Sequence, residues 1–290
     1  MEYIELGNGT AMPVLGLGVY RVTDQEECSR TVTAALHAGY QLIDTAAIYG
    51  NERAVGRGIA ESGVARDQVF LSTKTWVKDY GYERTARAID ASLDRLGTRW
   101  VDLLLLHHPY GDVAGSWRAL EAAVADGRAR AIGVSNFLPG DLERLTRTAS
   151  IAPMVNQIES HPYFQRAGFA SALAMDGIAP EAWYPLGHGS PGLMREPLLI
   201  GVATAHGKSV AQVILRWHIQ SGFVAIPKST DPAHLAENID VFDFALSRDE
   251  MSAIAGMDKD SAMFRAPRWL MSATTRLVPV PRARRTTTHT

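Results

Sequence analysis

The sequence predicts a parallel (β/α)₈ barrel, and three observations lead to that prediction. Short apolar runs alternate with stretches of helical period, which gives eight strand–helix units at intervals of about 25–40 residues. The runs are apolar almost throughout, as in residues 101–106, which is typical of strands covered on both faces. Residues with reactive side chains fall at the carboxyl ends of these runs, where barrels carry their active sites. A doubly wound sheet is the structural alternative, and it would gather such residues at one switch point.

The elements are expected in a regular order. A hairpin turned at Asn8-Gly9 covers residues 3–13, because Asn-Gly suits the positive φ angles of a two-residue turn. The strands are expected at 14–18, 40–44, 69–73, 101–106, 130–134, 153–157, 178–183 and 223–226. The helices are expected at 25–38, 51–62, 82–96, 114–126, 139–147, 164–175, 209–220 and 232–239, with extra turns at 195–206 and 247–256. We therefore predict one barrel domain over residues 1–270. Residues 271–290 lose the periodicity and gain Arg, Thr and Pro, so we predict a disordered tail there.

Composition excludes several classes of protein. The chain has 290 residues, 46% of them hydrophobic, which is enough to bury a sizeable core. Its net charge is −2, so neither nucleic acid nor an anionic membrane is an expected partner. A single cysteine, Cys28, excludes a disulfide framework and a Cys-rich metal site. No run approaches the roughly 18 apolar residues of a membrane span, and the amino terminus lacks a signal-peptide pattern. We expect a cytoplasmic monomer that acts on a small molecule.

Residues 43–52 place an acid and a phenol five positions apart, at the end of an apolar run. Tyr49 can act as an acid near neutral pH only if its ordinary pKa of about 10 is lowered. A buried cation can lower it, and such a cation needs a carboxylate partner in turn. Lys74 and Asp44 suit these two roles, so we predict a proton relay from Asp44 through Lys74 to Tyr49. Alternatively, Asp44 is a turn residue and Tyr49 lies on a rim.

His107 and His108 close the apolar run that begins at Val101. A histidine at a strand end can orient a carbonyl oxygen or carry a proton. It can also cap the core or bind a metal. No His, Asp or Glu set at ligand spacing lies nearby, and adjacent residues on a strand face opposite ways, so we expect no metal.

Amide, hydroxyl and aromatic groups end three further strands. Ser135, Asn136 and Gln157 can hydrogen-bond a planar carboxamide, which offers both a donor and an acceptor. Trp183 can stack on a flat heterocycle. Each motif alone is weak, because an Asn after a strand is usually part of a turn and a Trp is often a core residue.

Two segments are candidates for phosphate binding. Residues 187–192 match G-x-G-x-x-G, but they do not follow the first strand, so we do not interpret them as a Rossmann fingerprint. Their glycines still allow the backbone to approach a pyrophosphate. Residues 226–230 bring Lys228, Ser229 and Thr230 to a helix start, which suits a phosphate monoester. A capped surface helix is the alternative.

Over residues 3–260 the sequence resembles the aldo-keto reductase superfamily. Seven ordered motifs carry the resemblance: residues 43–52, 72–76, 102–109, 132–137, 155–162, 181–187 and 226–238. The short loop after His108 and the stretch EAWYPLG look most like the bacterial 2,5-diketogluconate reductase branch. The resemblance implies a barrel that binds NADPH without a Rossmann domain and reduces aldehydes or ketones.

The resemblance also implies roles for individual residues. Tyr49 is the general acid, Asp44 and Lys74 lower its pKa, and His107 orients the carbonyl. The implied cofactor-binding residues are Gly18, Val19, Asp44, Ser135, Asn136, Gln157, Trp183, Pro185, Leu186, Gly187, Gly189, Lys228, Ser229, Thr230, His234, Glu237 and Asn238. The implied substrate-pocket residues are Tyr20, Tyr49, Trp76, His107, His108 and Trp269, with Phe264 as a further candidate. A regulatory barrel that binds cofactor with little turnover is the alternative function.

Three positions depart from the family pattern. His234 stands where the family usually has an Arg, and a largely neutral imidazole makes no bidentate phosphate contact. We therefore expect NADPH use with a weakened preference and some use of NADH. His108 and Tyr20 replace frequent tryptophans, which favours small or hydroxylated carbonyls over bulky apolar ones.

Overall fold

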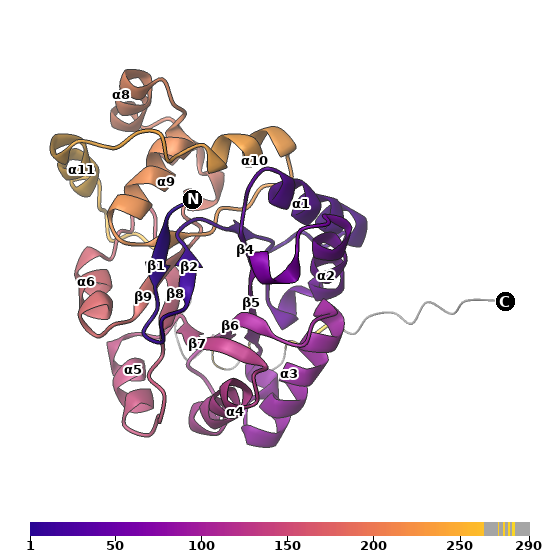
Figure 1. Cartoon of the computed structure of the whole chain (residues 1–290). Helices are drawn as coiled ribbons and strands as arrows, with labels where there is room; N and C mark the ends of the chain where they lie inside the picture. Colours follow the sequence, from indigo (N-terminus) through magenta and orange to yellow (C-terminus); the bar gives the residue numbers. More distant parts are fainter. Residues whose placement is uncertain (264–271, 273–274, 276–277, 279, 282–290) are drawn as a thin grey trace.

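The computed structural model describes residues 1–263, 272, 275, 278, 280 and 281, and a sheet of eight parallel strands lies at its centre (Figure 1). The strands are β3 (Leu17–Gly18), β4 (Leu42–Asp44), β5 (Phe70–Thr75), β6 (Val101–Leu106), β7 (Ala129–Ser135), β8 (Val155–Glu159), β9 (Ala179–Trp183) and β10 (Val224–Ala225). They are hydrogen-bonded in chain order, and each neighbouring pair is parallel.

The sheet closes on itself. A parallel bridge joins Leu15 to Ala225, and the Gly16 N–H donates to the Ala225 carbonyl over 2.9 Å. In the other direction, the Ala225 N–H donates to the Val14 carbonyl, also over 2.9 Å. A doubly wound sheet has two open edges, whereas here the first strand segment pairs with the last. The predicted (β/α)₈ barrel is confirmed.

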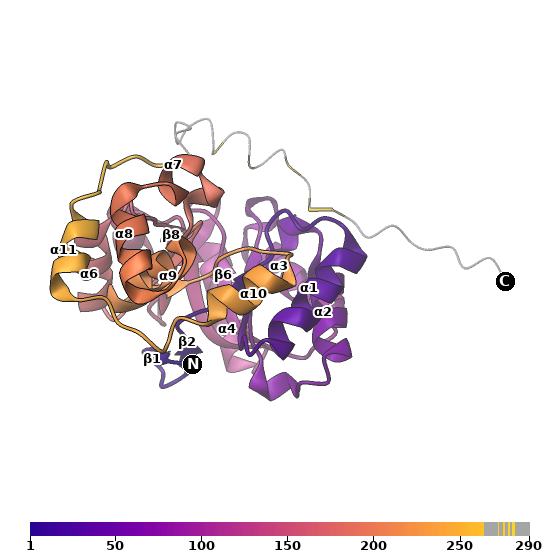
Figure 2. The same cartoon turned by 90° about the horizontal axis from the view of Figure 1, so that it is seen from above.

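Helices follow the strands and surround the barrel. They are α1 (Gln25–His37), α2 (Glu52–Glu61), α3 (Tyr82–Leu96), α4 (Val113–Ala125), α5 (Pro139–Thr146), α6 (Ala167–Met175), α7 (Pro191–Met194), α8 (Pro197–His206), α9 (Val210–Gln220), α10 (Pro232–Ile239) and α11 (Arg248–Ala255). Seen from above, α1–α3 cover one side of the barrel, and α8, α9 and α11 cover the other (Figure 2). These bounds agree with the predicted helices to within a few residues.

Two helices differ from the prediction for local reasons. Helix α6 begins three residues later than expected, because Arg166 has φ 54° and so lies outside the helical region. Helix α7 was not predicted, and Pro191 opens it at a first-turn position that suits proline.

The amino-terminal hairpin closes one end of the barrel interior. It consists of β1 (Tyr3–Glu5) and β2 (Ala11–Pro13), and Gly9 supplies the positive φ of 80° in its turn. Leu6 and Met12 are buried against the interior side chains of the strands. The opposite, carboxyl end of the strands is therefore the end that is available for a site.

Alternation along the strands sets which side chains reach that end. On β6, Leu103 and Leu105 belong to the cluster inside the barrel, and Leu104 and Leu106 pack under the helices. The same period of two places His107 on the interior face beyond Leu105.

In the part of the chain that the structure describes, no single helix is long and apolar enough to cross a membrane. Helices α8 and α9 meet that test only when they are taken together, and they meet at a bend of 89°.

Candidate active site

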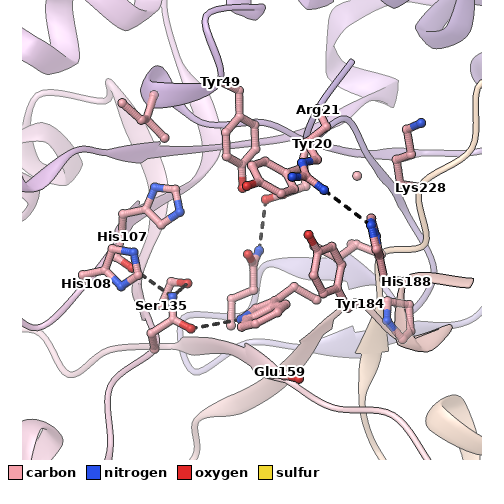
Figure 3. Close-up of a pocket in the computed structure, with 18 of the residues that line it drawn as sticks. Tyr20, Arg21, Tyr49, His107, His108, Ser135, Glu159, Tyr184, His188 and Lys228 are labelled. Carbon is pink, nitrogen blue, oxygen red and sulfur yellow. Dashed lines mark hydrogen bonds between the residues drawn. The ribbon is translucent and has the colours of Figure 1, made fainter. Parts of the chain in front are cut away.

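A cavity of about 820 Å³ opens at the carboxyl end of the barrel strands. Its lining combines residues from the loops after most of the strands, several of which are visible in Figure 3. The predicted site residues that line it are Gly18, Tyr20, Asp44, Tyr49, Trp76, His107, His108, Ser135, Asn136, Gln157, Trp183, Pro185, Leu186, Gly189 and Lys228. The fold therefore brings together most of the residues that the sequence singled out, although their roles remain predictions.

Lys74 and Asp44 form a buried ion pair beneath the cavity. Lys74 Nζ lies 2.7 Å and 2.6 Å from Asp44 Oδ1 and Oδ2, and 2.9 Å from the Thr45 carbonyl oxygen. Lys74 is 0% exposed and Asp44 is 2% exposed. An ammonium has three donors, so these three acceptors match all of them. Asp44 therefore compensates the buried charge of Lys74.

Tyr49 differs from the prediction in its electrostatics. It ends a short 3₁₀ helix, Ala47–Tyr49, and its ring centroid lies 5.3 Å from Lys74 Nζ. Burial raises the pKa of Tyr49 well above its ordinary value, and the carboxylate of Asp44 raises it further. The net shift is therefore opposite to the predicted lowering, and Asp44 contributes to the rise. The donors of Lys74 are directed at Asp44 and Thr45 rather than at the phenol oxygen.

His107 is a neutral imidazole beside Tyr49. Burial lowers its pKa well below the ordinary value, with His108 and Lys74 as further causes. Its ring lies 5.8 Å from the Tyr49 ring and 5.1 Å from the Trp76 ring, edge to face in both cases. Its buried Nδ1 has no hydrogen-bond partner among the described residues. A neutral ring that holds one N–H suits the orienting of a carbonyl oxygen better than the carrying of a proton.

The two adjacent histidines do not face opposite ways as expected. The rings of His107 and His108 are stacked, with centroids 5.0 Å apart and an angle of 11°, and both line the cavity. His107 keeps the inward orientation of the strand, but strand β6 ends at Leu106, so the alternation does not continue to His108. Burial lowers the pKa of His108 to about 4, so this ring is neutral at ordinary pH.

The side chain of Asn136 forms hydrogen bonds with groups at the ends of neighbouring strands. Its amide nitrogen donates to the His107 carbonyl over 3.1 Å and to Ser135 Oγ over 3.0 Å. Its Oδ1 accepts a hydrogen bond from Trp183 Nε1 over 3.0 Å. Asn136 was predicted to hold a carboxamide, yet in this structure its polar atoms bond to protein groups.

Gln157 bonds to two carboxyl groups, one of which the sequence analysis missed. Its Nε2 donates to Asp44 Oδ1 over 3.0 Å and to Glu181 Oε2 over 2.8 Å. Glu181 is 0% exposed, and burial raises its pKa to about 8, with the charge of Asp44 as a second cause. A signal for Glu181 was present: it shares the inward period of two with Trp183 at the end of β9.

Only part of the predicted phosphate-binding cluster lines the cavity. Lys228 lines the cavity, whereas the other members, Ser229, Thr230, His234, Glu237 and Asn238, lie outside its lining. Asp231 caps helix α10 by accepting from the Ala233 N–H, and the side chain of His234 is 64% exposed, 4.0 Å from Asp231. The capped surface helix that was left as an alternative is therefore present beside Lys228.

Two further predicted cofactor residues do not line the main cavity. Val19 is fully buried, and Gly187 lines a smaller neighbouring cavity of about 240 Å³. Gly187 still shapes the loop, because its φ is 55°.

Loops that the sequence analysis did not pair meet across the cavity. Arg21 Nη1 lies 3.4 Å from His188 Nε2, and the Tyr20 and Tyr184 rings are 6.2 Å apart (Figure 3). Non-glycine residues with positive φ concentrate in the lining: Arg21, Asn136, Arg166, Tyr184 and His188. Strained backbone of this kind clusters at functional sites. Sequence patterns carry no signal for it.

The carboxyl-terminal segment also reaches the cavity. Trp76 Nε1 donates to the Val278 carbonyl over 3.0 Å, and Thr275 and Val278 line the cavity. Both belong to the range that we predicted as a tail. The predicted pocket residues Phe264 and Trp269, and most of residues 271–290, lie outside the described residues.

No group of three or more His, Cys, Asp or Glu side chains that could hold a metal ion occurs among residues 1–263 and the five later residues that the structure describes.

The closed barrel carries a phenol, a neutral imidazole and a buried lysine–carboxylate pair at its carboxyl end, which is where (β/α)₈ enzymes have their active sites. The family model for the aldo/keto reductase family matches residues 5–192 and 195–259. The chain belongs to the aldo/keto reductase family, and carbonyl reduction is the activity that its relatives support. Its membership of the 2,5-diketogluconate reductase branch stays a prediction.

Individual relatives agree with this assignment. The chain is 48% identical over 269 residues to a morphine 6-dehydrogenase of Pseudomonas putida, covering 88% of this chain and 90% of the relative. It is 47% identical over 260 residues to a glyoxal reductase of Bacillus subtilis, covering 89% and 94%. Among solved structures, an aldo/keto reductase of Brucella melitensis is 45% identical, with a TM-score of 0.85 over 89% of this chain and 99% of that one. An aldo-keto reductase of Bombyx mori in complex with NADP is 33% identical, with a TM-score of 0.87 over 93% and 96%.

Proposed function

We propose that this protein reduces small, oxygen-rich aldehydes and ketones, such as dicarbonyls and keto-sugars, with NADPH as reductant and Tyr49 as proton donor. The observation that carries the proposal is the meeting of Tyr49 and His107 in the cavity, 5.8 Å apart between ring centroids. A carbonyl oxygen placed between them can accept from the phenol and from the imidazole. We also propose that the protein acts as a cytoplasmic monomer.

The residues of the cavity fit a nicotinamide dinucleotide. Gln157 presents an amide oxygen without a partner among the described residues, and Trp183 offers a ring for stacking. Ser135 and Gln157 would hold the carboxamide, residues 185–189 would cover the pyrophosphate, and Lys228, Ser229 and Thr230 would take the 2′-phosphate. When bound, the reduced cofactor supplies the hydride. The complex of the Bombyx mori neighbour with NADP supports this choice of cofactor.

Tyr49 holds its proton until the carbonyl oxygen gains negative charge. Its raised pKa keeps the phenol protonated at neutral pH, which is the state that reduction requires. As the proton leaves, the positive charge of Lys74, 5.3 Å from the ring centroid, stabilises the phenolate that forms. His107, neutral and beside Tyr49, donates to the same oxygen and orients it.

The substrate class follows from the walls of the cavity. His108 gives the wall a neutral polar ring, and Tyr20, Trp76 and Tyr110 line the same cavity. Hydroxyl or second carbonyl groups of a substrate can hydrogen-bond to these polar edges. The similarity to a glyoxal reductase supports a small dicarbonyl as substrate.

The test is to mix the purified protein with NADPH and a panel of methylglyoxal, glyoxal and keto-sugars, and to follow the loss of NADPH absorbance. We expect turnover with at least one vicinally oxygenated carbonyl. Tyr49→Phe should lower kcat by about 10²–10⁴-fold, in the range of general acid catalysis, and leave cofactor affinity nearly unchanged. Retained activity in this variant would remove Tyr49 from its role, and absence of turnover by the wild type would favour the regulatory alternative.

A further inference from the structure

Glu181 is a buried acid that neither packing nor the proposed reaction explains. It lies in the middle of β9 with 0% exposure, directly across the strand pair from Gln157. Its Oε1 has no hydrogen-bond partner among the described residues. A carboxyl group in such a place costs stability that an apolar side chain of similar volume would not cost.

The polar contact that Glu181 makes is with Gln157. The Gln157 Nε2 donates to Glu181 Oε2 over 2.8 Å and to Asp44 Oδ1 over 3.0 Å. An amide nitrogen carries two hydrogens, so the two carboxyl groups use both. The opposite amide orientation would place the Gln157 oxygen against the Asp44 carboxylate, which has no hydrogen to donate, and Glu181 Oε2 would lose the amide hydrogen that it accepts. Two neighbouring acids therefore fix the orientation of this amide.

The fixed amide leaves Gln157 with one group for a ligand. Its Oε1 makes no hydrogen bond within the described residues, and Gln157 lines the cavity. We propose that Glu181 is a positioning residue, which holds Gln157 so that an acceptor faces the cavity and selects a ligand with an amide N–H₂ group. The proposal rests on the proposed function, because the carboxamide of a nicotinamide is the group that Gln157 would receive.

Without Glu181, Asp44 would not give the same selection between donor and acceptor groups of a ligand. With a single acid neighbour, one amide hydrogen of Gln157 would be free, and the side chain could turn its nitrogen toward the cavity. A ligand that carries an acceptor, such as a carboxylate, could then bind there. Glu181 thus sets the discrimination between donor and acceptor groups at this position, and it does so without touching the ligand.

The test compares binding of NADP⁺ with binding of its deamido analogue, in which a carboxylate replaces the carboxamide, by calorimetry. We expect wild-type protein to bind NADP⁺ more tightly by at least about tenfold, since the analogue offers no donor to Gln157. Glu181→Met keeps the length of the side chain and removes the acceptor, and it should lower that ratio by about tenfold. Glu181→Gln keeps an acceptor oxygen and should retain the ratio.

A matched control is Glu52→Met, since Glu52 is another carboxyl with 1% exposure, paired with Arg95 away from the cavity lining. It should leave the ratio unchanged. If Glu181→Met does not fold, Glu181→Leu carries the same expectation. Two results would overturn the role of Glu181. One is a folded Glu181→Met or Glu181→Leu variant that keeps the wild-type ratio of the two affinities. The other is a Glu181→Gln variant in which that ratio falls. Wild-type protein that binds no NADP⁺ at all would instead overturn the proposed function.

Discussion

Lys74 Nζ lies between the two carboxylate oxygens of Asp44, 2.6 Å and 2.7 Å away, and neither side chain is more than 2% exposed. A buried pair of this kind is costly to break, because the remaining partner keeps its charge without compensation. The pair therefore links the stability of the barrel to the electrostatics of Tyr49.

Replacing Lys74 by Met should destabilise the protein by about 3–5 kcal/mol, because Asp44 would be left as an unpaired buried charge. Urea unfolding measures this loss. The double variant Asp44→Asn with Lys74→Met should regain much of the stability but not the activity. As a control, Arg57→Met breaks an exposed pair with Glu26 and should cost no more than about 1 kcal/mol.

The pH profile should differ between the two directions of the reaction. The pKa of Tyr49 is raised and that of His107 is lowered, so neither group titrates between about pH 6 and 8. The kcat/KM for reduction should therefore be nearly flat between about pH 6 and 7, below the range in which Glu181, with its pKa of about 8, loses its proton. Oxidation of an alcohol needs the phenolate, whose fraction rises with pH below the Tyr49 pKa, so its kcat/KM should rise by up to about tenfold per pH unit. A reduction profile with a midpoint near pH 7 would contradict this assignment.

His108→Trp should shift substrate preference from polar to apolar carbonyls. The variant removes a neutral imidazole from the wall and fills part of the cavity with a large apolar ring. The ratio of kcat/KM for methylglyoxal over that for an aromatic aldehyde should fall by about tenfold, the size of one lost hydrogen bond. His37→Trp, on the exposed side of α1, should leave the ratio unchanged. An unchanged ratio in His108→Trp would show that this ring does not contact the substrate.

His234→Arg should increase the preference for NADPH over NADH by about tenfold, because a guanidinium makes a bidentate contact with a phosphate and an imidazole does not. His234 lies in the first turn of helix α10, which follows Lys228 in the chain, and its side chain is 64% exposed. The preference is measured as the ratio of the two kcat/KM values. His37→Arg adds the same charge elsewhere and should leave the ratio as it is. If the wild-type protein already prefers NADPH over NADH by several hundredfold, the expected weak preference is refuted.

The architecture was predictable because it depends on the hydrophobic period of each segment and on the length of that segment. Alternating strand and helix periods predicted the barrel, and the closing bridge between Leu15 and Ala225 confirms it. The position of Asp44, Lys74 and Gln157 near the ends of apolar runs predicted that they would lie near one another at the carboxyl end of the barrel, and hydrogen bonds join both Lys74 and Gln157 to Asp44. Errors arose where a single backbone angle decides, as at Arg166, whose positive φ delays helix α6.

The site was less predictable where contacts join residues on different elements, because the hydrophobic period of one element does not show which side chains of another element it meets. The bond between Gln157 and Glu181 depends on the register of two strands, and the approach of Arg21 to His188 depends on two loop conformations. The raised pKa of Tyr49 depends on how deeply the fold buries the phenol and on how close it brings the Asp44 carboxylate. Residue types and spacing do not determine these quantities.

The closing of the barrel has a consequence for how the chain folds as it is synthesised. Leu15 leaves the ribosome early, and its partner Ala225 emerges only after all the other barrel strands. Until then the β3 edge of the sheet has no partner, and Lys228 cannot complete the cavity that Asp44 and Tyr49 begin. Long-range pairing of this kind slows folding and leaves strand edges exposed to aggregation. The nascent chain therefore passes through a stage in which one strand edge is unpaired and the cavity is incomplete.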